Sequence, residues 1–167
     1  MGVSCVGESN KNRREEGKIK GSDLKKVDTL LDVSNSLCKI ETSKYEGNGF
    51  FIKINKNEKN YFYLMSNEHI ISKKIIEKKE TISITYKRNK KIEIELDKDK
   101  RYIRDFRDMK IDATVVEILE KDNIKEKYFL EPDIEYLYSF KNLINKEIWI
   151  PQFLNGINLS RGQIILP

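Results

Sequence analysis

Residues 61–71, YFYLMSNEHII, contain the only histidine of the 167-residue chain. An apolar run ends at Met65, and the residues after His69 (ISKKIIEKKE) have the spacing of a short helix, so the histidine lies at a predicted strand–helix junction. Histidine has an ordinary pKa of about 6.5 and can therefore accept and return a proton near neutral pH. His69 is thus a candidate general base.

Segments on both sides of this stretch indicate β-structure. Residues 47–54 (GNGFFIKI) begin with glycines, which in a strand mark a bulge or a close backbone approach, and the polar turn NKNEKN leads from them into the histidine strand. Residues 82–86 and 92–96 alternate apolar and polar side chains around the turn KRNKK, which predicts a hairpin. Further strands are predicted at 37–41, 112–119 and 148–153. The expected fold is all-β with short helices.

Three segments, taken in chain order, resemble the front half of a trypsin-like (chymotrypsin-fold) serine peptidase. They are GNGFFIKI, the sequence SNEHI that follows YFYLM, and IDATVVEIL at residues 111–119. The resemblance covers about residues 36–162 and is closest to intracellular trypsin-like domains of protists and fungi without disulfides. It implies that His69 is the general base and that Asp112, at the start of a strand, is the carboxylate that orients it. Two departures are visible: Glu68 stands where the family often has alanine, and the small residue after the acid is displaced by one. Glu68 would raise the pKa of the histidine if the two side chains lay close together.

A peptidase of this family also needs a nucleophile, and the three segments that carry the resemblance do not contain one. The family carries its serine in a Gly-x-Ser-Gly type of turn, whose amides point at the oxyanion, and the sequence contains no such turn. Ser139 and Ser160 lack flanking glycines, and Cys38 lies on an early strand among predicted core residues. We therefore expect a serine endopeptidase-like domain with an incomplete triad, inactive as given.

The predicted organisation is a flexible basic arm at residues 1–21 followed by an incomplete peptidase domain at 22–167. That domain comprises a short helix at 22–32, a first barrel at about 33–120, a connector at about 121–145 and the start of a second barrel at about 146–167. The connector includes a helix over 122–131 that ends at Pro132. Within the barrel, the charged residues 97–110 are expected to be a link held by Tyr102, Ile103 and Phe106.

Composition limits the partners. The net charge is +5, but outside the arm lysines alternate with acids, so a nucleic-acid partner is not expected. The two cysteines form no disulfide framework or metal spacing, and no signal peptide is visible, which favours an intracellular, cytoplasmic protein without cofactor or metal. Gly2 with Cys5 raises the possibility of acylation, although Val6 departs from the myristoylation pattern.

Three functions remain open at this point. The first is the peptidase domain, acting on a peptide or protein substrate together with a missing C-terminal half. The second is a non-catalytic interaction module built on the same barrel. The third is a membrane-tethered regulator held by an acylated Gly2 and the basic arm.

Overall fold

The computed structural model describes residues 33–87, 89–132, 147–153 and 157–163. Antiparallel strands dominate them, and the helices are short. In chain order the elements are β1 (Leu37–Glu41), β2 (Glu46–Lys56), β3 (Lys59–Ser66), α2 (Lys73–Glu77), β4 (Thr81–Tyr86), β5 (Lys90–Glu95), β6 (Ile103–Asp105), η1 (Arg107–Met109), β7 (Thr114–Glu117), η2 (Glu120–Asp122), η3 (Glu126–Tyr128), β8 (Glu147–Phe153) and β9 (Ile157–Gln163).

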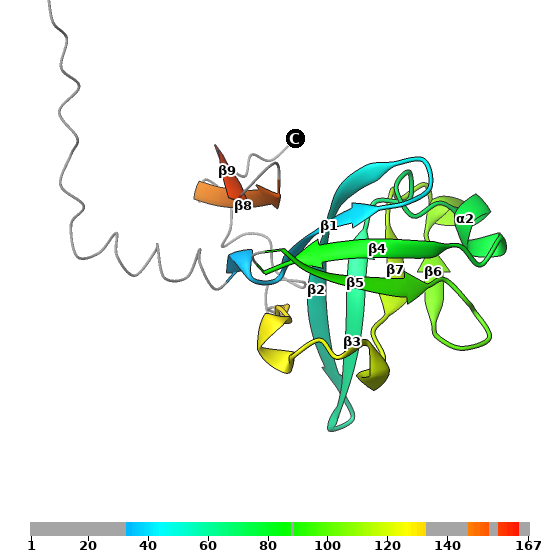
Figure 1. Cartoon of the computed structure of the whole chain (residues 1–167). Helices are drawn as coiled ribbons and strands as arrows, with labels where there is room; N and C mark the ends of the chain where they lie inside the picture. The colour runs from blue at the N-terminus through cyan, green and yellow to red at the C-terminus, as the bar shows by residue number, and fades with distance from the viewer. Residues whose placement is uncertain (1–32, 88, 133–146, 154–156, 164–167) are drawn as a thin grey trace, which may run out of the picture.

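The first seven strands form one sheet in the order β5-β4-β1-β2-β3-β7-β6, and every neighbouring pair is antiparallel. The sheet curls on itself into a half-barrel, with α2 at one end (Figure 1). The predicted all-β class is therefore confirmed. Whether this half-barrel is the first barrel of a chymotrypsin-like pair stays a prediction.

Two hairpins follow directly from their turn chemistry. Asn57 and Glu58, at the tip between β2 and β3, both have positive φ (52° and 61°), the backbone that a tight two-residue hairpin turn requires. Asn89 supplies a φ of 73° at the tip between β4 and β5. Both tips lie where polar residues interrupt the predicted strands.

The concave face of the sheet carries the core. Phe51 on β2 makes an edge-on contact with Tyr86 on β4, with ring centroids 5.4 Å apart, and a tilted contact with Phe129 at 5.5 Å. The alternate residues of β4 point inward, as the hairpin pattern predicts. The fully buried side chains of the core include Cys38, Ile40, Phe51, Leu64, Ile71, Ile82, Ile84, Tyr86, Ile94, Leu96 and Val116.

The structure corrects the prediction for residues 97–110. This segment is not only a link, because Ile103–Asp105 forms the edge strand β6 beside β7. Ile103 is buried as expected, but Tyr102 is 55% exposed, since it precedes the strand on the outer side and its ring contacts Tyr63. Because β6 has only three residues and lies in a highly charged segment, the sequence pattern did not predict it.

The predicted helix over residues 122–131 is also wrong. The chain forms two separate 3-10 turns, η2 and η3, and then Leu130 pairs with Ile52 in an isolated parallel bridge. The tertiary packing of Tyr128 and Phe129 into the end of the half-barrel overrides the local helical preference. The predicted helix at 22–32 and the arm at 1–21 lie outside the described residues.

A second, two-stranded sheet consists of β8 and β9, paired antiparallel from Glu147↔Gln163 to Phe153↔Ile157. The strand predicted at 148–153 is confirmed. Residues 157–163 return alongside it as β9.

Candidate active site

His69 lies in a tight turn just after β3. The backbone amides of Ile70 and Ile71 both donate to the carbonyl of Asn67, at 3.2 and 3.1 Å, so the chain reverses directly after Ser66. Ile70 and Ile71 are buried beneath the turn, whereas His69 points to solvent. The apolar residues on either side of the histidine thus hold the turn in place.

Asp112 reaches the same place from the other side of the ladder. Strand β7 begins at Thr114, which is the register partner of Ser66, the last residue of β3. Because the two strands are antiparallel, the segment after β3 and the segment before β7 leave the sheet at the same end of the strands. The sequence positions of His69 and Asp112 therefore place them face to face.

The two side chains are in hydrogen-bond contact. His69 Nδ1 lies 2.7 Å from Asp112 Oδ2, and the backbone N–H of His69 donates to Asp112 Oδ1 at 3.0 Å. Asn67 adds its side-chain amide, 3.2 Å from Oδ2. The expected proximity of His69 and Asp112 is confirmed, and both carboxylate oxygens are engaged.

These contacts fix the protonation pattern. The pKa of Asp112 is lowered mainly because its carboxylate accepts the backbone N–H of His69, with further contributions from the imidazole and from Asn67. An ionised carboxylate can only accept, so Nδ1 must carry the proton of a neutral imidazole. Nε2 is then the basic nitrogen, and no hydrogen bond within the described part of the chain uses it. This is the arrangement of a general base.

The pair is open to solvent, which departs from the buried carboxylate of a working triad. The side chains of His69 and Asp112 are 64% and 52% exposed. Water screens their interaction, so the contact is weaker than it would be under a cover. Any partner surface that lay over this edge of the sheet would strengthen it.

Buried neighbours support the two loops from below. The Thr114 hydroxyl, fully buried, donates to the carbonyl of Ile71 at 2.9 Å and so ties the start of β7 to the histidine turn. Gly47 on β2 lies against Ile70: a β-carbon there would be only 2.6 Å from Ile70 Cγ1. Any larger residue at position 47 would therefore force the Ile70 side chain to move.

The Glu68 carboxylate is bound by residues of two neighbouring elements. Its side chain is buried, and Oε1 lies 2.5 Å from Arg107 Nη2 on η1. The same oxygen accepts a long contact, 3.4 Å, from the backbone N–H of Lys73 at the start of α2. Glu68 thus joins the histidine turn to the loop that leads into Asp112.

None of the described residues is placed as a nucleophile. Ser66 and Ser72 are equally close to His69 in sequence. The Ser66 hydroxyl donates to the carbonyl of Asn48, and among the described residues no hydrogen bond joins either serine to the imidazole. Cys38 is buried on β1, as predicted, and burial raises the pKa of its thiol, which makes it unreactive. Ser160 is part of β9, and Ser139 lies outside the described residues.

Sequence reasoning missed the residues that hold the pair. The sequence shows Asn67 only as a polar residue two positions before the histidine. It shows Thr114 only as the first residue of a strand near Asp112. Nothing local could have revealed Arg107, because its contact with Glu68 spans two loops. These supports depend on the three-dimensional fold.

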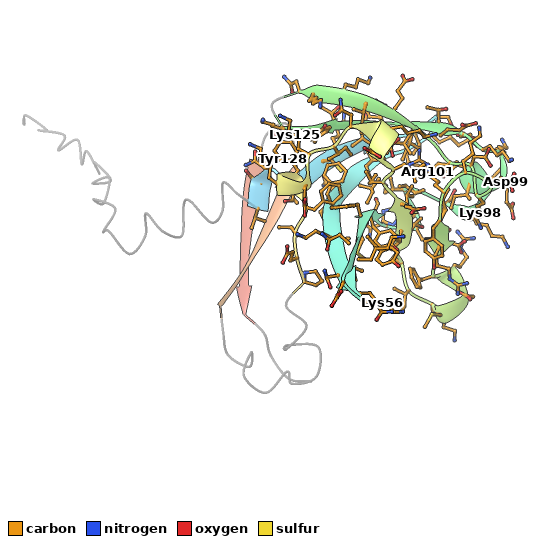
Figure 2. The ribbon with its side chains drawn as sticks, turned by 90° about the horizontal axis from the view of Figure 1, so that it is seen from below. Lys56, Lys98, Asp99, Arg101, Lys125 and Tyr128 are labelled. Atoms are coloured by element: carbon orange, nitrogen blue, oxygen red, sulfur yellow. The ribbon has the colours of Figure 1, made fainter. Side chains whose placement is uncertain are left out.

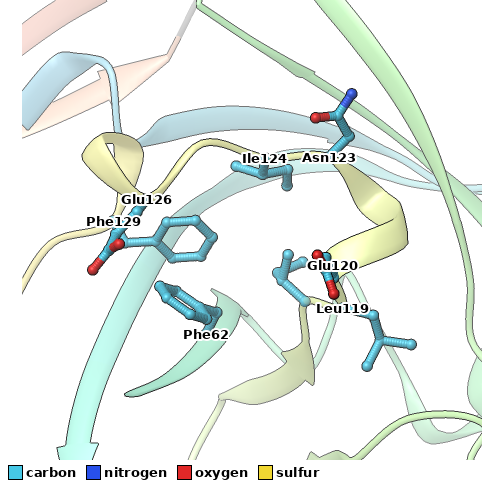
Figure 3. A pocket seen from close by; sticks show the side chains of 8 residues that line it. Phe62, Leu119, Glu120, Asn123, Ile124, Glu126 and Phe129 are labelled. Atoms are coloured by element: carbon cyan, nitrogen blue, oxygen red, sulfur yellow. The ribbon is translucent and has the colours of Figure 1, made fainter. Parts of the chain in front are cut away.

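A separate cavity of about 400 Å³ lies away from the pair, between β3 and the segment 118–129. Its floor is apolar, with Phe62 and Phe129 in edge-on contact at 4.8 Å, and Glu120, Asn123 and Glu126 stand at its rim (Figure 3). Glu126 is engaged by Lys53 at 3.0 Å. The cavity has no contact with His69 or Asp112.

Within the described ranges, no group of three or more His, Cys, Asp and Glu side chains is arranged to hold a metal ion. None of the helices in this part of the chain is long and apolar enough to cross a membrane. Comparisons of the chain with protein-family models, with curated proteins and with solved structures gave no match.

Proposed function

We propose that residues 33 to about 120 form the first barrel of a trypsin-like serine endopeptidase domain, with His69 as general base and Asp112 as the carboxylate that orients it. The observation that carries the proposal is the 2.7 Å contact between Nδ1 and Oδ2, which leaves Nε2 free to accept a proton. The chain order of base and acid, and their places at the ends of β3 and β7, add support.

The proposed chemistry is acyl transfer to a serine. Nε2 of His69 takes the serine proton as the serine oxygen bonds to the peptide carbonyl carbon, and Asp112 stabilises the imidazolium that results. The imidazolium then returns the proton to the leaving amine as the carbon–nitrogen bond breaks. Water repeats the sequence and releases the acid. The base and the acid are assigned to this chain, and the serine with its oxyanion amides to a second structural unit that covers the exposed pair.

Activity-based labelling of the protein isolated from its source tests the proposal. We expect a fluorophosphonate to label one serine, His69→Ala to abolish labelling, and Asp112→Asn to slow it severely because the wrong tautomer is then favoured. Asp108→Asn is the matched control, since that exposed carboxylate lies on the same loop but bonds Arg104 instead. Labelling that survives His69→Ala would refute the assignment.

A second function, a non-catalytic interaction module, is favoured by two observations. The 167 residues contain no Gly-x-Ser-Gly turn, and both side chains of the pair are more than half exposed. In that case the hydrogen bond between His69 and Asp112 only holds two loops together, and the barrel binds peptide or protein without cleaving it. Tethering through Gly2 remains a further prediction. Absence of labelling in the source protein, with the fold intact, would favour this function.

A further inference from the structure

Four lysines gather around two tyrosines at the end of the half-barrel where segment 120–132 lies, away from α2 (Figure 1). Lys87 at the tip of the β4–β5 hairpin donates to the Tyr128 hydroxyl, and its Nζ is 4.9 Å from the Tyr128 ring centroid. Lys127 Nζ lies 5.7 Å from the same ring, and Lys90 Nζ 5.5 Å from the Tyr86 ring. Lys125 is the fourth (Figure 2). These residues are called the Tyr128 cluster below.

The charge around the Tyr128 hydroxyl is of one sign. Its pKa is lowered first by the Lys87 hydrogen bond, which outweighs the opposing effect of burial, and then by the charges of Lys87, Lys127 and Lys125. Glu126, between two of these lysines in sequence, turns away to Lys53 on β2, with 3.0 Å between Oε1 and Nζ. The ion pairs of the described residues give none of the four lysines a carboxylate partner. The cluster is therefore an uncompensated positive site.

The centre of the cluster is buried and packed. Tyr128 is only 4% exposed, and its ring packs edge-on against buried Tyr86, with centroids 5.9 Å apart. Its hydroxyl accepts from Lys87, so the hydroxyl proton remains available to donate, and no described group accepts it. A hydroxyl donor on a buried tyrosine thus lies among lysines that are all exposed at the surface.

We propose that the Tyr128 cluster is a binding site for a phosphate group, with the Tyr128 hydroxyl and the ammonium groups of Lys87, Lys125 and Lys127 as its ligands. Lysine binds phosphate as a compact point charge, and hydroxyl side chains are common phosphate donors. Separate ammonium groups around a point suit a tetrahedral, doubly charged oxyanion, whereas a planar carboxylate is better matched by the fork of arginine. The phosphate could be carried by a soluble compound or by a lipid headgroup.

The test is a titration of the full-length protein with inorganic phosphate, followed by amide chemical shifts in two-dimensional NMR at constant ionic strength. We expect saturable shifts in residues 86–90 and 125–129. The triple variant Lys87→Gln, Lys125→Gln and Lys127→Gln should bind at least about tenfold more weakly, the combined effect of three exposed ion pairs. Tyr128→Phe, which keeps the ring and all the charges, should weaken binding by a smaller factor.

The matched control removes the same charge elsewhere. Lys44, Lys56 and Lys98 are exposed and outside the cluster, and Figure 2 shows Lys56 and Lys98 well away from Tyr128. Replacing these three with glutamine should leave the phosphate affinity within about twofold. Equal weakening by both triple variants would mean unspecific attraction to the net charge and would overturn the proposal, as would the absence of saturable shifts.

Vesicles distinguish the two sources of phosphate. We would compare phosphatidylcholine vesicles with and without phosphatidic acid, using the wild type and the cluster triple variant. Retention that needs both phosphatidic acid and the cluster lysines would identify a lipid phosphate. Phosphate binding in solution without retention on vesicles would identify a soluble phosphate compound.

Discussion

Gly47→Ala probes how closely β2 must approach the histidine turn. The new methyl carbon would lie 2.6 and 2.7 Å from Ile70 Cγ1 and Cδ1, and 3.2 Å from Cγ2. Carbon atoms pack best at about 3.5–4.0 Å, so Ile70 would have to move by roughly 1 Å. It is only 6% exposed and cannot swing into solvent. Overpacking of this kind costs about 1–3 kcal/mol, and the lower entropy of the unfolded alanine chain offsets roughly 0.4–1 kcal/mol.

We therefore expect Gly47→Ala to lower the free energy of unfolding by roughly 1.3 kcal/mol, the difference between the midpoints of these two ranges. Urea unfolding followed by circular dichroism measures it. Ile70→Ala alone should cost about 2–5 kcal/mol, since it leaves a cavity in the core. In the double variant, truncation of Ile70 removes all three close contacts. Its cost should fall short of the sum of the single costs by the overpacking term, about 1–3 kcal/mol, because the entropy term is the same in both backgrounds.

Gly49 provides the contrast. A β-carbon there would be 2.6 Å from Ile40 Cδ1 but also 2.8 Å from the backbone carbonyl oxygen of Met65. Truncating Ile40 cannot relieve the second contact, so Gly49→Ala with Ile40→Ala should show less compensation than the Gly47 pair. Additive costs for Gly47→Ala and Ile70→Ala, within about 0.5 kcal/mol, would refute the packing argument.

Three further predictions concern other parts of the fold. Thr114→Val should cost about 1–3 kcal/mol in urea unfolding, because it leaves the carbonyl of Ile71 buried without its donor; a cost below about 0.5 kcal/mol would count against this link. The pKa of Asp97 is lowered to about 2, mainly by the hydrogen bond from Lys79. The ionised carboxylate therefore adds to the free energy of unfolding. This contribution is complete above the unfolded-state pKa of about 3.9 and is lost as the pH falls through 2. Unfolding curves from pH 6 to 2 should show Asp97→Asn to be less sensitive to acid than the wild type, and identical profiles would contradict it. With the other cysteine replaced by serine, buried Cys38 should react with a thiol reagent only on unfolding, and rapid reaction of the native protein would show the burial to be wrong.

The sequence was sufficient to predict the elements with clear periodicity. Alternating residues identified the β4–β5 hairpin, and the apolar run ending at Met65 located β3 and the turn after it. The pairing of His69 with Asp112 was also predictable, because both residues stand at strand ends in an order that fits one known arrangement. Their catalytic role is a proposal that the geometry supports.

Other features depend on contacts that sequence patterns do not encode. β6 is too short and too charged to show a period, and it forms because β7 offers an unpaired edge. Residues 122–131 have a helical composition, yet the burial of Tyr128 and Phe129 in the end of the half-barrel dictates 3-10 turns. The Glu68–Arg107 contact joins residues from different loops, so only the folded chain brings them together.

Asp112 should hold the neutral His69 imidazole with its proton on Nδ1 and its lone pair on Nε2. Because the chain has a single histidine, nitrogen-15 NMR of the imidazole reports on this residue without ambiguity. In the neutral ring we expect the Nδ1–H tautomer to dominate in the wild type, and the Nε2–H form to gain in Asp112→Asn. Asp108→Asn should leave the tautomer unchanged. A wild-type ring that is mainly Nε2–H, or a tautomer ratio that Asp112→Asn does not alter, would contradict the account.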